Sequence, residues 1–148
     1  MTFENIEIDN TLADISLEKS GIKSYQMEEK EVFMNAKMKK HFHDILSCIK
    51  HKLQEQVDNT VKFLKDEGGS HMPDIQDRAT LETDMQLELR TRDRERKLIR
   101  RINNSLQSIQ DGDYGYCKNC DNEINIRRLE ARPIANLCID CKTAEESK

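Results

Sequence analysis

The 148-residue chain contains no tryptophan, only two prolines and five glycines, and aromatic residues make up 5% of it. Charged residues make up 35% of the sequence and apolar residues 36%. So few bulky apolar side chains cannot fill a wide hydrophobic core, and the scarcity of proline and glycine leaves room for long helices. The composition predicts an elongated helical protein held together by narrow apolar seams.

The sequence also lacks an excess of positive charge and any long apolar run. Its net charge is −4, whereas proteins that bind duplex DNA or anionic membranes are usually basic. No apolar run approaches the roughly 20 residues needed to span a bilayer, and the acidic residues 1–10 lack the pattern of a secretory signal. Nothing in the overall charge therefore indicates binding to duplex DNA or to a membrane. Cysteines with metal-site rather than disulfide spacing, described next, favour a reducing cytoplasm.

Four of the five cysteines form two pairs, Cys117-x-x-Cys120 and Cys138-x-x-Cys141, with seventeen residues between them. This is the spacing of a four-thiolate zinc site, because each C-x-x-C turn can present two sulfurs to one tetrahedral ion. Four thiolates close the coordination shell, so one structural Zn²⁺ is expected rather than a catalytic one. A redox dithiol would instead accompany a βαβ pattern, which is not seen. The fifth cysteine, Cys48, is expected to be a small buried hydrophobe.

Two long stretches carry apolar residues at steps of three or four, which is the spacing of one face of an amphipathic helix. The first runs from Met34 to Glu67 and is followed by Gly68-Gly69, and the second follows a turn at residues 70–76 and ends near Gln110. The second is interrupted by a charged run between Leu89 and Leu98. Helices of matched length joined by a short turn are expected to pack antiparallel as a two-stranded coiled coil. The apolar positions are Phe42, Ile45, Ile49, Leu53, Val57, Val61 and Leu64 in the first helix and Leu81, Met85, Leu89, Ile99, Ile102, Leu106 and Ile109 in the second.

The expected fold is mainly α, with a long antiparallel coiled-coil hairpin attached to a small globular domain that carries a four-cysteine zinc finger and a C-terminal helix. Residues 34–111 would form the hairpin, with its tip at about residues 68–79, and residues 112–148 the zinc module. The segment between the cysteine pairs is too short for a core of its own, so the metal must supply much of its folding free energy. Residues 1–33 would form an N-terminal arm, either packed on or near the globular part or loosely ordered.

Segments around the cysteines and along the second helix have a distinctive sequence. They are Tyr114-Gly-Tyr-Cys117-x-x-Cys120, Ile126-Arg-Arg-Leu-Glu-Ala-Arg-Pro133, Leu137-Cys-Ile-Asp-Cys-Lys142, Leu87-Glu-Leu-Arg90, Arg92-Asp-Arg-Glu-Arg-Lys-Leu-Ile99 and Asp77-Arg-Ala79. In this combination the chain resembles the DksA/TraR family of bacterial transcription factors from about Phe33 to Lys142. A four-cysteine motif alone is shared by many unrelated modules, whereas its combination with the hairpin and the arginine-rich run is far more specific.

The resemblance implies a monomeric regulator that is not an enzyme and that binds RNA polymerase rather than DNA. Members of the family insert the coiled-coil tip into the secondary channel of the polymerase and destabilise open promoter complexes. They act together with the nucleotide ppGpp, repress ribosomal RNA promoters and assist certain amino-acid biosynthesis promoters.

The resemblance places Asp74, Asp77 and Ala79 at the tip, where the activity of the family depends on the two acids. From the residues alone, Asp74 could equally be the N-cap of the second helix, with Asp77 reaching back from the third helical position. The two roles can coexist. The family usually has Asp-Pro-x-Asp here, whereas this chain has Ile75 in place of the proline and so lacks a fixed φ angle at the tip.

The run from Arg90 to Arg101 carries seven arginines or lysines. Such a run is usually a solvated helix face with local ion pairs. By resemblance, however, Arg94 falls where the family contacts the rim of the polymerase channel, and a further set of residues helps to form a ppGpp site against the polymerase. Lys142, a member of that set, could also be placed simply for its favourable position near a helix or beside the negative zinc–thiolate centre. The set comprises Leu98, Arg101, Arg132 and Lys142.

Two other functions fit the sequence less well. A zinc-ribbon nucleic-acid binder would need exposed aromatic residues or a basic stripe, and only Tyr114 and Tyr116 lie near the zinc motif. A coiled-coil adaptor would need a second apolar seam for assembly, and the outer face of the predicted hairpin is too charged to suggest one. No nucleophile–base constellation or open metal site indicates an enzyme.

Overall fold

The computed structural model describes residues 21–67 and 75–147 of the chain. Most of the predicted N-terminal arm and most of the predicted turn at residues 70–76, including Asp74, therefore lie outside the described residues. The backbone of Asp77 is described but its side chain is not.

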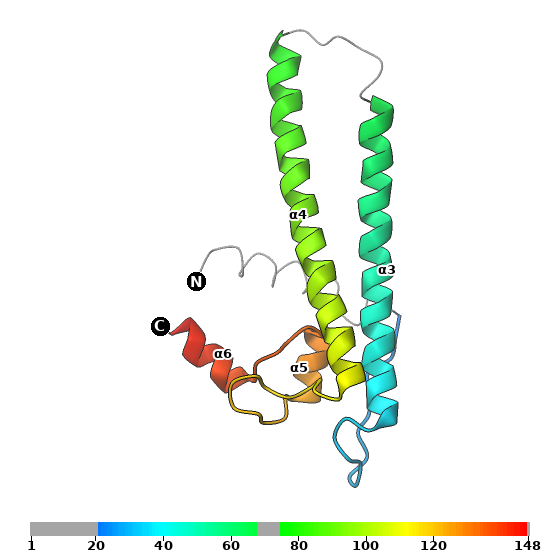
Figure 1. Cartoon of the computed structure of the whole chain (residues 1–148), viewed down its shortest axis with the longest axis vertical. Helices are drawn as coiled ribbons and strands as arrows, with labels where there is room; N and C mark the ends of the chain where they lie inside the picture. Colours follow the sequence, from blue (N-terminus) through cyan, green and yellow to red (C-terminus); the bar gives the residue numbers. More distant parts are fainter. Residues whose placement is uncertain (1–20, 68–74, 148) are drawn as a thin grey trace.

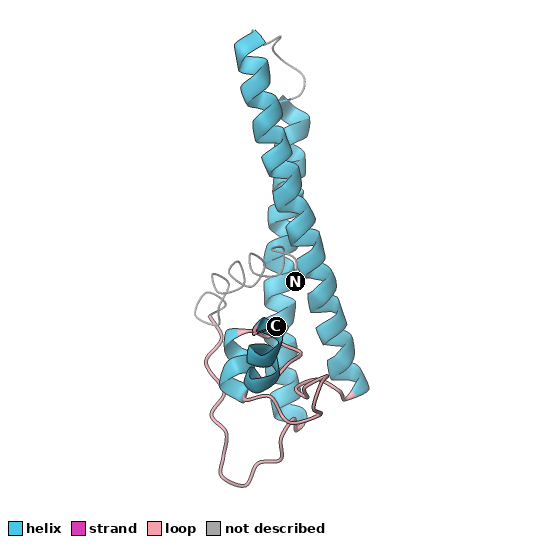
Figure 2. Cartoon of the chain, turned by 90° about the vertical axis from the view of Figure 1, so that its left-hand side faces the viewer, coloured by secondary structure: helices cyan, strands magenta, loops and turns pink. Residues whose placement is uncertain are grey.

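Two long helices dominate the structure and run antiparallel to each other (Figure 1). Helix α3 spans Ala36–Glu67 and helix α4 spans Ile75–Asp111. Two short helices, α5 (Ile126–Ala131) and α6 (Ile139–Glu146), follow, and both views place them beside the base of the hairpin, where α3 begins and α4 ends (Figures 1 and 2). The mainly α fold expected from the sequence is confirmed.

Local chemistry defines the two helix ends at the base. At the start of α3, the Oδ1 atom of Asn35 accepts a hydrogen bond of 2.9 Å from the backbone N–H of Met38, as an N-cap residue does. At the end of α4, the backbone N–H groups of Gly112, Asp113 and Tyr114 all point to the carbonyl oxygen of Ser108, at 3.0, 3.0 and 3.2 Å. Gly112 has a φ of +89°, which a glycine adopts easily after the last turn of a helix.

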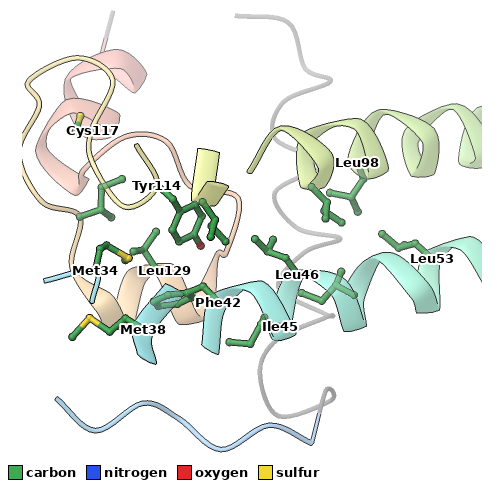
Figure 3. Packing of buried hydrophobic residues seen from close by; sticks show 14 residues of the cluster. Met34, Met38, Phe42, Ile45, Leu46, Leu53, Leu98, Tyr114, Cys117 and Leu129 are labelled. Atoms are coloured by element: carbon green, nitrogen blue, oxygen red, sulfur yellow. The ribbon is translucent and has the colours of Figure 1, made fainter. Parts of the chain in front are cut away.

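The buried core lies at this base, where the hairpin meets the C-terminal segment (Figure 3). Phe42 of α3 is fully buried and its ring lies 5.5 Å from the ring of Tyr114. The hydroxyl group of Tyr114 donates a buried hydrogen bond of 2.7 Å to the carbonyl oxygen of Pro133. The hairpin and the C-terminal segment therefore share one core. Its apolar members are Met34, Met38, Phe42, Ile45, Leu46, Ile49, Leu53, Leu98, Ile102, Ile109, Tyr114, Cys117, Ile124 and Leu129.

Among the described side chains, the apolar seam between α3 and α4 is fully buried only in the half of the hairpin near the base. Leu53 and Leu98 are each 2% exposed, but farther out Leu81, Met85 and Leu89 of α4 are 54%, 50% and 53% exposed. The prediction that these three residues pack against α3 is wrong. In Figure 1 the helices also lie farther apart at their outer ends than near the base. The loss of burial begins at the charged run between Leu89 and Leu98, which interrupts the seam of α4.

The N-terminal segment 21–35 joins the base through one carboxylate. Glu130 of α5 is 8% exposed, and its Oε1 atom accepts a hydrogen bond from the backbone N–H of Tyr25. The same oxygen lies 3.2 Å from Nε2 of His41 on α3, and the rings of Tyr25 and His41 lie 5.4 Å apart. Glu130 therefore connects the N-terminal segment, the hairpin and α5.

Gly115 is a position at which even one methyl group should be costly. Its φ is +91°, and a Cβ atom there would lie 2.6 Å from Cε of the buried Met34 and 3.2 Å from Cε1 of Phe33. We expect Gly115→Ala to lower the free energy of unfolding by about 1–2 kcal/mol for the backbone strain, plus about 1–3 kcal/mol for overpacking. Gly112→Ala is the matched control, because φ there is +89° but nothing lies within 4 Å of the added atom. Urea denaturation of both variants checks this, and equal losses would contradict the overpacking term.

Candidate functional site

The two cysteine pairs come together although they belong to different elements. Cys117 and Cys120 lie in the loop after α4, whereas Cys138 is the N-cap of α6 and Cys141 lies within its first turn. All four Sγ atoms lie within 4.8 Å of one another, and those of Cys120 and Cys138 are 3.7 Å apart. Sulfurs bound to one tetrahedral zinc ion at about 2.3 Å are separated by about 3.8 Å. The cluster therefore fits zinc in both size and donor type.

Backbone hydrogen bonds shape the turn that carries the first pair. The N–H of Asp121 donates to the carbonyl oxygen of Cys117, and the N–H of Cys117 donates to the carbonyl oxygen of Asn122, both at 2.8 Å. Asp121 adopts a positive φ of 57° to close this turn. An isolated antiparallel bridge between Tyr116 and Glu123 then continues it. The turn thus holds the Sγ atoms of Cys117 and Cys120 on the side of the loop that faces the second cysteine pair.

Hydrogen bonds to sulfur connect and orient the second pair. The Sγ atom of Cys138 accepts a hydrogen bond of 3.5 Å from the backbone N–H of Cys141. The side-chain amide of Asn119, which lies between the first two cysteines, donates a bond of 3.4 Å to Sγ of Cys141. Such N–H donors stabilise negative charge on sulfur, which is the form that binds metal.

The thiol of Cys117 loses its proton far more readily than the thiol of Cys120. Burial of Cys117 opposes its ionisation, but the backbone N–H groups of Cys138, Asn119 and Cys120 outweigh this and lower the pKa of Cys117 to about 6. The N–H of Asn122 favours ionised Cys120, yet the neighbouring thiols and burial prevail and raise the pKa of Cys120 to about 12. A divalent cation would displace the protons that these crowded sulfurs retain.

A basic hollow of about 1130 Å³ adjoins the cysteine cluster, between the last turns of α4, the turn at 112–121 and the C-terminal elements. The sequence-predicted residues Arg101, Arg132 and Lys142 all line it. Arg128 lines the hollow too, and its Nε atom donates a hydrogen bond of 3.1 Å to the carbonyl oxygen of Leu137. Sequence reasoning missed Arg128, which lies on α5 only four residues before Arg132, the residue that follows the helix.

The lining of the hollow is mixed in charge, with basic residues in excess. Five basic side chains face three acidic ones, Asp113, Asp121 and Glu145. Lys142 Nζ lies 3.4 Å from Glu145 and 3.6 Å from Glu146, on the exposed side of α6. An anion in the hollow would therefore compete with these two exposed carboxylates for Lys142.

Two family models cover most of the chain. The N-terminal domain of the DnaK suppressor protein DksA matches residues 38–109, and the prokaryotic dksA/traR C4-type zinc finger matches residues 112–147. The chain belongs to the DksA/TraR family. The resemblance found in the sequence is confirmed.

Several DksA relatives match over nearly the whole length. The chain is 49% identical over 127 residues to the RNA polymerase-binding transcription factor DksA of Escherichia coli (strain K12) and to that of Salmonella typhimurium (strain LT2), covering 86% of this chain and 83% of each relative. It is 48% identical over 130 residues to the DksA of Haemophilus influenzae, covering 88% and 89%. Among solved structures, transcription factor DksA2 from Pseudomonas aeruginosa is similar, with a TM-score of 0.75, 29% identity and coverage of 94% and 95%.

The remaining residues that the DksA/TraR resemblance singles out lie along α4. Ala79 and Arg94 are exposed on this helix, well away from the cysteines. Leu98 is 2% exposed and belongs to the core rather than to the lining of the hollow. The structure therefore brings together three of the four residues predicted to contact ppGpp. None of the described helices is both long enough and apolar enough to cross a membrane.

Proposed function

We propose that this chain is a transcription regulator that binds RNA polymerase directly, as a monomer in the cytoplasm and without binding DNA. It inserts the tip of the hairpin into the secondary channel and modulates the stability of open complexes together with ppGpp. Ribosomal RNA promoters are repressed and some amino-acid biosynthesis promoters are assisted. The observation that carries this proposal is the identity of 48–49%, over most of both chains, to relatives named RNA polymerase-binding transcription factors.

The shape of the molecule supports entry into a channel. Helix α4 has 37 residues and is therefore about 55 Å long. Its outer half extends beyond the core and carries the exposed Ala79. A pair of helices is only about 20 Å across, since each is about 10 Å wide. We propose that Asp74, Asp77 and Ala79 act at the tip, and that Arg94 contacts the rim of the channel.

The basic hollow supports binding of a phosphorylated nucleotide. Arginine offers planar paired donors to phosphate and lysine offers a mobile positive charge. We propose that Arg101, Arg132 and Lys142 contact the phosphates of ppGpp at the interface with polymerase, together with Arg128. Leu98 would then act indirectly, because its burial positions the turn of α4 that precedes Arg101.

The cysteine cluster supports one structural zinc ion. We propose that Cys117, Cys120, Cys138 and Cys141 all bind Zn²⁺, which leaves no open coordination position for water or substrate. The ion would fix the turn after α4 against the start of α6, and so form one wall of the hollow. The two family matches meet near residue 111, and we propose the same division between a hairpin domain and a zinc module.

Binding to purified core polymerase tests the proposal. The full chain should be retained by immobilised core enzyme, and it should repress transcription from a ribosomal promoter more strongly when ppGpp is present. If the chain fails to bind core polymerase, the coiled-coil adaptor becomes the better interpretation.

Substitutions in the hollow test the nucleotide site separately. We expect Arg132→Ala or Lys142→Ala to raise the ppGpp concentration needed for half-maximal repression about tenfold or more, because a hydrogen bond to a charged group contributes about 1.5–3 kcal/mol. Repression without ppGpp should be retained. Arg127→Ala is the control, since Arg127 is exposed on the same helix as Arg128 but does not line this hollow. An unchanged ppGpp response in both hollow variants would contradict the assignment.

A further inference from the structure

Charged residues occupy the middle of the seam between the two long helices. Counting from the base at steps of three and four, the face of α4 that meets α3 carries four apolar residues, then three charged ones, then apolar residues again. The charged positions are Glu95, Arg92 and Glu88. The apolar positions are Ile109, Leu106, Ile102 and Ile99 on the base side and Met85 and Leu81 on the outer side.

Arg92, at the centre of this charged stretch, is only 4% exposed. Its Nη1 atom reaches across to the carbonyl oxygen of Val57 on α3 at 3.5 Å, and its Nη2 atom lies 3.4 Å from Oε1 of Glu88. Its Nε atom is buried without a hydrogen-bond partner within the described part of the chain. Burial also raises the pKa of Glu95, one turn away, against the attraction of Arg92. A buried charge with long, incomplete hydrogen bonds stabilises a helix pair poorly.

Among the described side chains of α4, apolar burial falls sharply beyond the level of Arg92. On its base side Leu98 and Ile102 are 2% and 0% exposed. On its outer side Leu81, Met85 and Leu89 stay half exposed, although the antiparallel register set by the contact between Arg92 and Val57 places the half-buried Val61 of α3 at the level of Leu89. The outer residues have the right chemistry and spacing to pack, so their composition does not explain the opening.

We propose that Arg92 is a positioning residue that keeps the outer half of the hairpin open. Its long side chain lies between α3 and α4 at the level of Val57, and it holds the two backbones too far apart for the residues beyond it to interlock. The separation of the two helices at their outer ends, and with it the direction of the tip, is thereby determined by a residue inside the hairpin. The consequence for transcription rests on the proposed function, whereas the consequence for packing does not.

Arg92→Leu tests the packing directly, because it replaces the buried guanidinium at the centre of the seam with an apolar side chain, while Glu88 and Glu95 keep their places on either side of it. Amide hydrogen exchange of residues 78–91 in the full zinc-loaded chain should become about tenfold slower or more, as half-exposed leucine and methionine side chains become buried. The melting temperature should rise. In transcription assays the variant should repress more weakly than wild type although it is more stable.

Two variants keep the test specific. Arg96→Leu makes the same change at an exposed arginine of α4 and should leave exchange in residues 78–91 unchanged. Arg92→Lys keeps a long charged side chain in the seam and should exchange like wild type. Unchanged or faster exchange in Arg92→Leu would overturn the proposal, and faster exchange with a lower melting temperature would show that Arg92 merely stabilises the hairpin. Absence of polymerase binding by wild type would remove only the transcriptional consequence.

Discussion

Removal of zinc is expected to unfold residues 112–147 while most of the helical content survives. Structural zinc contributes about 10–16 kcal/mol to the folding of small modules, and the core of this one offers little else, chiefly Tyr114, Ile124 and Leu129. The hairpin retains its own contacts, among them Leu46 and Ile102. Because α5 and α6 have only 6 and 8 residues against 32 and 37 in α3 and α4, the far-ultraviolet ellipticity should fall only slightly.

The near-ultraviolet circular dichroism of the tyrosines should report the unfolding of residues 112–147 most clearly. Tyr114 is buried and Tyr116 lies one residue before Cys117, and the chain has no tryptophan to obscure them. The near-ultraviolet circular dichroism should therefore weaken when a strong chelator is added and return with one equivalent of Zn²⁺. Cys138→Ser should behave like the chelated protein. Cys48→Ser is the matched control, since Cys48 lies outside the cluster. A chelated protein with an intact tyrosine signal would contradict the structural role of the metal.

Asn substitutions at the two tip acids should abolish regulation without affecting stability. Asparagine caps helices as well as aspartate does, so Asp74→Asn and Asp77→Asn should leave the melting temperature within about 2 °C of wild type. Repression of a ribosomal promoter should fall about tenfold or more in each variant, because a hydrogen bond to a charged group contributes about 1.5–3 kcal/mol.

A neighbouring acid provides the comparison for this experiment. Asp84 is exposed on α4, seven residues beyond Asp77, and Asp84→Asn removes the same charge outside the proposed tip. It should repress normally. Wild-type repression by both tip variants would refute the functional assignment and leave helix capping, which asparagine preserves, as the role of the two acids.

The main elements could be predicted from the sequence because they depend on short-range patterns. Helical periodicity together with Gly112 placed the end of α4, and two C-x-x-C turns identified the cysteine cluster. The resemblance to the DksA/TraR family brought Arg101, Arg132 and Lys142 together before any distance was known. Each of these patterns involves residues that are close in the sequence or belong to one motif. It therefore does not depend on how distant elements pack.

Features that depend on how distant elements meet could not be predicted in the same way. Arg92 belongs to a run that looks like a solvated helix face, and only the register against Val57 makes it a buried residue. Leu81 and Met85 have seam spacing, yet a neighbouring charged layer determines whether they pack. Glu130 likewise became important only through Tyr25 and His41, which lie about a hundred residues away in the sequence.

The junction at Glu130 gives the molecule the properties of a lever. Its fulcrum is the base, where one carboxylate contacts the N-terminal segment and α3, and its arm is the length of α4, about 55 Å. A rotation of about 5° at the fulcrum displaces the far end of the arm by about 5 Å, which exceeds the length of a hydrogen bond. A rearrangement around Glu130 that rotated the hairpin by this amount would therefore move residues at its far end by several ångströms without changing any contact there.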